Sequence, residues 1–400
     1  MLIRDAEVEG RRVDVRIGER VEQIGSLVAG PAEEVLDAAG GALLPGLHDH
    51  HIHVLSLAAS LDSVHLGELA TAAPRHDGWI RVIGWDGKMT LDRARLDELR
   101  GDVPVRVQHR SGQLWVFNTA ALRALDLDVK GDGRVYRHDG LLRERMPART
   151  PDLDRVGRLL ARFGITGATD ATVSNGAAEA ELLAGLPQRL VVMSVTDGAP
   201  CKVVLHEPEL PSLSDLEDSV AAARRAGRPV AVHAVTRAEL ALALAVLESG
   251  DRVEHAGVCP PEMAAMLAAR DVTVVTQPHF PVERAEQYAS EVDPGDRPWL
   301  YPCTLFVEKG VPLGAGTDAP FGDPDPWKAI AAAIDRGLSP SRALDLFLTP
   351  PEAPGGIPRR VAENMPADLC LLDTGLAGAL AAPSSSLVRA TWVGGSRLET

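Results

Sequence analysis

The sequence predicts an α/β protein built on a closed (β/α)8 barrel, with a small β-sandwich from both termini and an inserted α/β lid subdomain. Between about residues 43 and 320, short Val-rich strands alternate with amphipathic helices, a pattern typical of parallel β/α architecture. Eight strands can be read there, which is the number that closes such a barrel. An open, doubly wound sheet is the alternative.

The chain termini show a different pattern. The stretches "VDVRIGER", "ADLCLLD" and "LVRATWVGG" alternate apolar and polar residues between Gly, Pro and Ser breaks. Such alternation predicts short antiparallel strands with one solvated face. We therefore expect residues 1–47 and 358–400 to form one β-sandwich.

The barrel is predicted over residues 48–357. Its predicted strands are, in chain order, "GALLPGLHDHHIHV", "GITGATDATV", "RLVVMSVT", "CKVVLH", "PVAVHAV", "RVEHAGV", "VTVVTQPHF" and "VPLGAGTDAP". The helices are predicted in "DLDRVGRLLARFG", "SLSDLEDSVAAARRAG", "RAELALALAVLESG", "PPEMAAMLAARD" and "DPWKAIAAAIDRG". Two places are irregular. Residues 61–147 form an insertion after the first strand, and only "DGAP" separates strands three and four, which leaves no room for a helix.

Composition excludes several classes of protein. With 41 basic and 56 acidic residues the net charge is -15, which repels phosphate backbones and anionic membranes. We expect neither a nucleic-acid partner nor a membrane partner. No secretion signal pattern and no membrane-length apolar run are present, which favours a cytoplasmic location. The four cysteines are scattered, so neither a disulfide framework nor a thiolate zinc site is indicated.

Polar residues gather at the predicted strand ends. Active sites of (β/α)8 barrels form at the carboxyl ends of the strands. The candidate metal ligands at these ends are His51, His53, Lys202, His233, His255 and Asp318. Each has an ordinary structural explanation, as a hydrogen-bonded histidine or a turn carboxylate. Because all six residues converge at one end of the predicted barrel, a metal site is favoured.

The spacing of these residues suits two ions. His51 and His53, at i and i+2 on a strand, point to one face and can bind one ion, while His233 and His255 can serve a second. A desolvated lysine can be neutral and react with CO₂ to give a bridging carbamate, which arginine cannot do. Lys202 is one of only five lysines. A lysine that extends its ammonium to solvent is the alternative.

The first strand also contains a second His-x-His pair, His48 and His50. Pleating places Asp49, His51 and His53 on one face and His48 and His50 on the other. The pattern alone does not say which face points inward.

The ordered segments "LLPGLHDHHIHV", "GITGATD", "VAVHAV", "DRVEHAG", "VVTQPHF", "GAGTDAPFG" and "ADLCLLD" resemble the amidohydrolase superfamily. Within it the resemblance is to amidohydrolase family 3, a group of metal-dependent hydrolases, and it covers nearly the whole chain. It favours His51 and His53 as the ligand pair, because Asp49 then takes the acidic position two residues before it.

The resemblance implies a hydrolase that cleaves an amide, carbamate or cyclic imide C–N bond of a small, partly apolar substrate by metal-activated hydroxide. One or two Zn²⁺ ions are expected, with carbamylated Lys202 as the bridge and Asp318 as the catalytic base. The alternatives are a metal-dependent decarboxylase or isomerase on the same site, and a non-catalytic scaffold.

Aromatic residues gather in the insertion and beside strand eight. They are Trp79, Trp85, Trp115, Phe117 and Tyr136, and Trp299, Tyr301 and Trp327. They are either core anchors or, with residues 281–303, part of a lid over the barrel mouth. With the lid, the expected substrate contacts are His109, Arg110, Gln113, Trp115, His206 and His279. The expected partner is a small molecule, and a homo-oligomer is compatible with the sequence.

Overall fold

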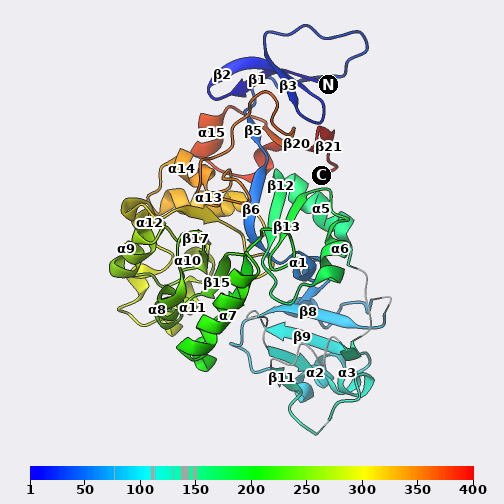
Figure 1. The fold of residues 1–400 in the computed structure, drawn as a ribbon. Coiled ribbons are helices and arrows are strands. Elements are labelled where there is room, and N and C mark those ends of the chain that lie inside the picture. The colour runs from blue at the N-terminus through cyan, green and yellow to red at the C-terminus, as the bar shows by residue number, and fades with distance from the viewer. Residues whose placement is uncertain (76, 110–111, 113, 129, 137–143, 147–150) are drawn as a thin grey trace. The chain divides into compact units, whose positions relative to one another are not determined.

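The computed structural model describes residues 1–75, 77–109, 112, 114–128, 130–136, 144–146 and 151–400 (Figure 1). It consists of two compact units, one of Met1–Val54 with Leu153–Thr400 and one of Leu55–Asp152. Both contain helices and strands, so the predicted mixed α/β class is confirmed. Arg110 and Gln113 lie outside the described residues.

The termini build two antiparallel-rich sheets in the first unit. One has the order β3-β2-β1-β4 and the other β21-β20-β19-β5. Their strands are β1 (Leu2–Val8), β2 (Arg11–Ile17), β3 (Val21–Gly25), β4 (Val35–Asp37), β5 (Leu43–Pro45), β19 (Leu369–Leu372), β20 (Val388–Val393) and β21 (Ser396–Arg397), with α15 (Leu376–Ala381) before β20. Ile3, Val15, Leu369 and Trp392 belong to one shared hydrophobic cluster. The domain limits 1–47 plus 358–400, 48–357 and 61–147 stay predictions.

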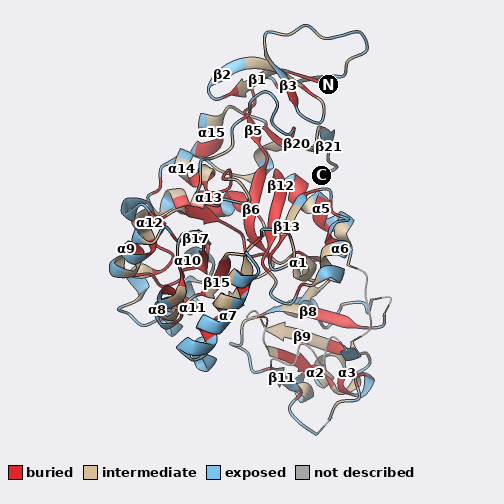
Figure 2. Ribbon diagram, viewed as in Figure 1, coloured by how far each residue is buried: buried red, intermediate tan, exposed pale blue. Residues whose placement is uncertain are grey.

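Parallel strands form the centre of the first unit. They are β6 (Leu47–Ile52), β12 (Ile165–Asp170) and β13 (Arg189–Val192) in one sheet, and β14 (Cys201–Val204), β15 (Val230–Ala234), β16 (Arg252–His255), β17 (Thr273–Thr276) and β18 (Leu313–Ala315) in another. Each predicted barrel strand has a counterpart here. Every residue of β6 and β12 is buried (Figure 2), as expected for parallel strands covered on both faces.

Helices alternate with these strands. They are α5 (Leu153–Arg162), α6 (Ala177–Leu183), α7 (Leu213–Arg225), α8 (Arg237–Val246), α9 (Pro261–Ala269), α10 (Phe280–Glu283), α11 (Ala285–Glu291), α12 (Cys303–Lys309), α13 (Pro326–Asp335) and α14 (Pro340–Asp345). Their starts follow local sequence signals. Ser212 caps α7, and Thr236 with Glu239 forms a capping box on α8. Only turns and bends lie between β13 and β14, as the short "DGAP" connection predicted.

The two parallel sheets meet through isolated backbone hydrogen bonds. On one side the Asp318 N–H donates to the His51 carbonyl at 2.7 Å and the His53 N–H to the Ala319 carbonyl at 2.9 Å. On the other, the Ser194 N–H donates to the Pro200 carbonyl at 2.9 Å. No continuous ladder joins the described strands into one ring. The closed barrel therefore stays a prediction.

The second unit carries a sheet of its own, in the order β11-β10-β9-β8-β7. Its elements are β7 (Val64–His65), β8 (Ile80–Trp85), α2 (Arg93–Arg100), β9 (Val105–His109), β10 (Leu114–Phe117), α3 (Thr119–Ala124) and β11 (Arg134–Tyr136), and α1 (Val54–Leu61) leads into it. Trp79, Trp115 and Phe117 share one hydrophobic cluster and Trp85 belongs to another. These aromatic residues therefore act as core anchors of the unit.

Short 3₁₀ helices lie at Leu66–Glu68, Glu207–Glu209, Arg297–Trp299 and Ser385–Leu387. Within the ranges described above, none of the helices combines the length and the apolar character needed to span a bilayer.

Gly316 permits the close approach of the two sheets. A Cβ atom at this position would lie 2.4 Å from the backbone nitrogen of His51. Backbone cannot move aside as a flexible side chain can, so a larger residue would push the segment after β18 away from β6.

We therefore expect Gly316→Ala to lower the free energy of unfolding by about 1–3 kcal/mol, the usual range for overpacking. Urea denaturation measures this change. Gly25→Ala is the matched control, because a Cβ there meets no atom within 4 Å. Equal stability of the two variants would contradict the close approach.

Candidate metal centre

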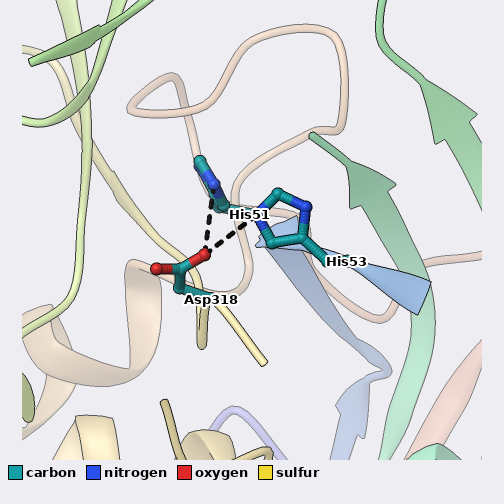
Figure 3. A group of neighbouring side chains, drawn as sticks. All are labelled: His51, His53 and Asp318. Carbon is teal, nitrogen blue, oxygen red and sulfur yellow. Dashed lines mark ion pairs between the residues drawn. The ribbon is translucent and has the colours of Figure 1, made fainter. Parts of the chain in front are cut away.

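His51, His53 and Asp318 form one cluster at the end of β6 (Figure 3). Asp318 Oδ1 lies 3.4 Å from His51 Nε2 and 3.1 Å from His53 Nε2. Ligand atoms of all three residues lie within 4.8 Å of one another. Two imidazoles and a carboxylate, with a position open for water or substrate, are a ligand set typical of catalytic zinc.

A buried carboxylate orients the ring of His51. Its Nδ1 is in short contact with Glu254 Oε2, and because a carboxylate only accepts, this nitrogen carries the proton. The lone pair then sits on Nε2, the atom that faces Asp318. Arg252 holds Glu254 in turn, with its Nη2 donating to Glu254 Oε2 at 3.1 Å. His53 is oriented similarly, since its Nδ1 is hydrogen-bonded to Thr172 Oγ1 at 2.8 Å.

Two further imidazoles adjoin this cluster from neighbouring strands. The His255 ring lies 4.8 Å from the His51 ring and 4.5 Å from the His233 ring, centre to centre. His255 Nδ1 is 2.7 Å from Gln277 Oε1, an acceptor, so its Nε2 is also free of a proton. The structure thus brings together histidines from β6, β15 and β16.

Lys202 lies buried on β14, and its Nζ has no hydrogen-bond partner among the described residues. Burial lowers its pKa to about 8, although Glu254 and Asp318 oppose this shift. About one tenth of the amine is therefore neutral at pH 7, far more than for a lysine with its ordinary pKa. A buried amine with no hydrogen-bond partner in the described part of the chain would suit a group that takes up CO₂ and then binds metal.

The protonation states of the buried imidazoles also suit metal binding. Burial lowers the pKa of His51 to about 3 and lowers the pKa values of His233 and His255. They are neutral near pH 7, which is the form that binds metal. Burial alone would raise the pKa of Asp318, but the interactions with His53 and His51 lower it, so this group is a carboxylate.

Two residues of the cluster have unusual backbone conformations. Asp318 has a φ of 56° and His255 a φ of 73°. Residues other than glycine rarely adopt this left-handed region, and those that do are concentrated at functional sites.

The second histidine pair points elsewhere. His48 Nε2 is 2.9 Å from Thr169 Oγ1, and His50 Nε2 is 2.8 Å from Thr349 Oγ1. Both rings are buried. The pleat of β6 thus directs His48 and His50 away from Asp318.

The predicted substrate contacts fall in different places. His279 is buried, with its Nε2 3.2 Å from the carbonyl of Thr317, the residue before Asp318. His206 is half-buried directly after β14. His109 and Trp115 belong to the second unit, where Trp115 packs in a hydrophobic cluster.

Sequence reasoning missed Arg252 and Glu254, and it gave Asp49 no function. Asp49 Oδ1 accepts from the backbone N–H groups of Thr317 at 3.0 Å and His51 at 3.1 Å. It thereby links β6 to the segment that carries Asp318. The sequence does contain a signal for Arg252 and Glu254. They are opposite charges at i and i+2 in the buried stretch "RVEH", and buried charges have to pair.

We expect Glu254→Gln to weaken zinc binding about 10- to 100-fold, the usual effect of removing a group that orients a ligating histidine. Competition with a chromogenic chelator measures the affinity, and circular dichroism verifies folding. Glu262→Gln, at an exposed position of α9, is the control. An unchanged affinity in Glu254→Gln would show that His51 needs no such support.

The chain is similar to a known protein family and to several solved structures. A family model described as "Amidohydrolase family" matches residues 34–398. An uncharacterised metal-dependent hydrolase from Pyrococcus horikoshii OT3 has 19% identity and a TM-score of 0.75, over 94% of this chain and 97% of that one. No match was found among curated protein sequences.

Two further solved structures share the fold. N-isopropylammelide isopropylaminohydrolase from Burkholderia multivorans ATCC 17616 has 18% identity and a TM-score of 0.54, over 99% of this chain and 97% of that one. A point mutant of atrazine chlorohydrolase TrzN from Arthrobacter aurescens TC1, complexed with zinc and atraton, has 15% identity and a TM-score of 0.57, over 99% and 94%. Because the family model covers most of the sequence, the chain belongs to the amidohydrolase family.

Proposed function

We propose that this protein is a metal-dependent hydrolase that cleaves the C–N bond of a small, partly apolar amide, carbamate or cyclic imide. The observation that carries the proposal is the grouping of His51, His53 and Asp318 with the rings of His233 and His255 beside them, together with a buried lysine whose Nζ has no partner among the described residues. Membership of the amidohydrolase family supports it. So does the fold shared with an isopropylaminohydrolase, an enzyme named for C–N cleavage.

The proposed metal is zinc, in one or two sites. His51, His53 and Asp318 would hold one ion, and His233 and His255 a second. Imidazole-rich ligand sets favour zinc over magnesium or calcium, and a structural relative was crystallised with zinc. When bound, zinc polarises a carbonyl group and lowers the pKa of water.

Lys202 is proposed as the bridge between the two sites. Its neutral Nζ would attack CO₂, forming an N–C bond and releasing one proton to solvent. The resulting carbamate would offer two oxygens as metal ligands. The support is the burial of Nζ and its lack of a hydrogen-bond partner among the residues that the structure describes.

Asp318 is proposed as the catalytic base. Its carboxylate would take a proton from the attacking water and return it to the leaving nitrogen. The backbone supports this function, because the hydrogen bond from the Asp318 N–H to the His51 carbonyl fixes the carboxylate beside the two imidazoles.

The architecture around the site is part of the same proposal. We propose that β6 and β12 to β18 close into a (β/α)8 barrel, supported by backbone hydrogen bonds at both junctions of the two sheets. The lid role of residues 61–147, the cytoplasmic location and a homo-oligomeric state stay predictions.

We expect Asp318→Asn to lower kcat by a factor of about 10² to 10⁴, because a general base of this kind contributes that much. The assay uses N-acyl amines, carbamates and cyclic imides, with zinc content measured in parallel. Asp335→Asn, exposed at the end of α13, is the control. Full turnover by zinc-loaded Asp318→Asn would refute its function, and CO₂ release from a substrate would indicate a decarboxylase instead.

We expect Lys202→Ala to reduce bound zinc from two ions per chain to one, since the second ion would lose its bridge. Elemental analysis of the purified protein measures this ratio. Lys309→Ala, at an exposed position of α12, should keep both ions. A wild-type value near one that Lys202→Ala leaves unchanged would refute the bridge.

A further inference from the structure

A pocket of about 540 Å³ lies at the opposite end of the central strands from the metal centre. Its lining includes residues at the starts of three parallel strands, His48 on β6, Thr166 on β12 and Arg189 on β13. Val21 and Leu369, which begin β3 and β19 of the terminal sheets, also line it. The candidate metal ligands lie at strand ends, so the pocket is a separate place on the same unit. Small-molecule sites usually have volumes of about 300–1,000 Å³.

Arg359 is a half-buried arginine of this lining. Its Nε donates to the Leu348 carbonyl at 3.1 Å and its Nη2 to the Gly46 carbonyl at 2.8 Å. These two bonds fix the guanidinium. Among the residues that the structure describes, Nη1 meets no hydrogen-bond acceptor, so its two N–H groups are left for a ligand. Burial lowers the pKa of Arg359, against the effects of Asp368 and Glu352, but an arginine stays cationic in proteins.

The charges around the pocket favour one negative charge. Two arginines of the lining are held in ion pairs, Arg189 with Asp368 and Arg360 with Asp345. The other three charged groups of the lining have no ion-pair partner within 4.0 Å in the described part of the chain, which leaves one positive charge in excess. A partly desolvated cation without an anionic partner loses solvation energy, which a bound anion would restore. The charged residues of the lining are Glu19, Arg20, Arg189, Arg359, Arg360 and Asp368.

Much of the remaining lining is apolar. Val361 and Leu369 belong to the hydrophobic cluster of the terminal sheets. A hydrocarbon chain would lose contact with water against such a wall, whereas a small hydrated anion would gain nothing there. The apolar residues of the lining are Val21, Pro45, Pro351, Val361, Met365, Pro366 and Leu369.

We infer that this pocket binds a small monocarboxylate with a hydrocarbon chain, such as a short-chain fatty acid. Arg359 holds the carboxylate through charge-assisted hydrogen bonds, and the chain lies against the apolar wall. Its local excess of positive charge attracts the anion although the net charge of the protein is -15. The site does not depend on the proposed hydrolysis, because it lies at the other end of the strands.

Calorimetry with the full chain, zinc-loaded and after chelation, tests the inference. The probes are acetate, butanoate and hexanoate, with 1-hexanol and inorganic phosphate for comparison. Arg359→Gln removes the cation, and Met365→Trp narrows the pocket while it leaves the hydrogen bonds of Arg359 in place. Arg336→Gln is the control for the first, because Arg336 is half-buried and donates to the Leu300 carbonyl at 2.6 Å. Met266→Trp, at an exposed position of α9, is the control for the second.

We expect hexanoate to bind with and without zinc, more tightly than 1-hexanol or phosphate, and its affinity to exceed that of butanoate by about fourfold per buried methylene. Arg359→Gln should weaken hexanoate binding about 10- to 100-fold, as for a hydrogen bond to a charged group. Met365→Trp should weaken hexanoate more than acetate, and both controls should behave as wild type.

Three results would overturn the inference. They are hexanoate binding that disappears with zinc, which would place the anion at the metal centre, a preference for phosphate, and wild-type affinity in both pocket variants. If Arg359→Gln fails to fold, Met365→Trp decides alone, and an unchanged affinity for hexanoate in that folded variant would contradict the site.

Discussion

The hydrogen bond between the Asp318 N–H and the His51 carbonyl, 2.7 Å long, is the contact on which the candidate site depends. It joins the two parallel sheets at the point where β6 ends. Asp49 reinforces the junction by accepting from Thr317, and Gly316 leaves the space that the approach requires. If this junction opened, the carboxylate of Asp318 would separate from the imidazoles of β6.

Around this junction, burial and pairing together determine the chemistry. Burial lowers the pKa values of His51 and His255 and leaves both rings neutral. Hydrogen bonds to Glu254 and Gln277 then fix which nitrogen of His51 and His255 carries the proton. Glu254 keeps its charge in the interior because Arg252 lies against it, and removing one partner of such a pair is costly. Ligand geometry and protonation thus follow from the same buried network.

Much of this could be predicted from sequence. Buried parallel strands are continuous Val-rich runs, and their alternation with helices identified β6 and β12 to β18 in order. The pleat separated His51 and His53 from His48 and His50, but only the family resemblance said which pair points inward. The opposite charges in "RVEH" could have indicated the Arg252–Glu254 pair, but the contact of Glu254 with His51 depends on the pairing between strands, which could not be predicted. Trp115, for which core anchor and substrate contact were the alternatives, packs in a hydrophobic cluster of the second unit, as expected where a small unit needs large aromatic residues for its core, and its contact with substrate stays a prediction.

Metal binding by His51, His53, Asp318 and their neighbours at the junction of the two parallel sheets can be observed in crystals of the zinc-loaded protein, by anomalous diffraction at the zinc absorption edge. We expect one peak beside the Nε2 atoms of His51 and His53, a second beside His233 and His255, and continuous density from Lys202 Nζ between them. An absence of peaks at this cluster, or zinc bound only elsewhere on the chain, would show that these residues do not form the metal site.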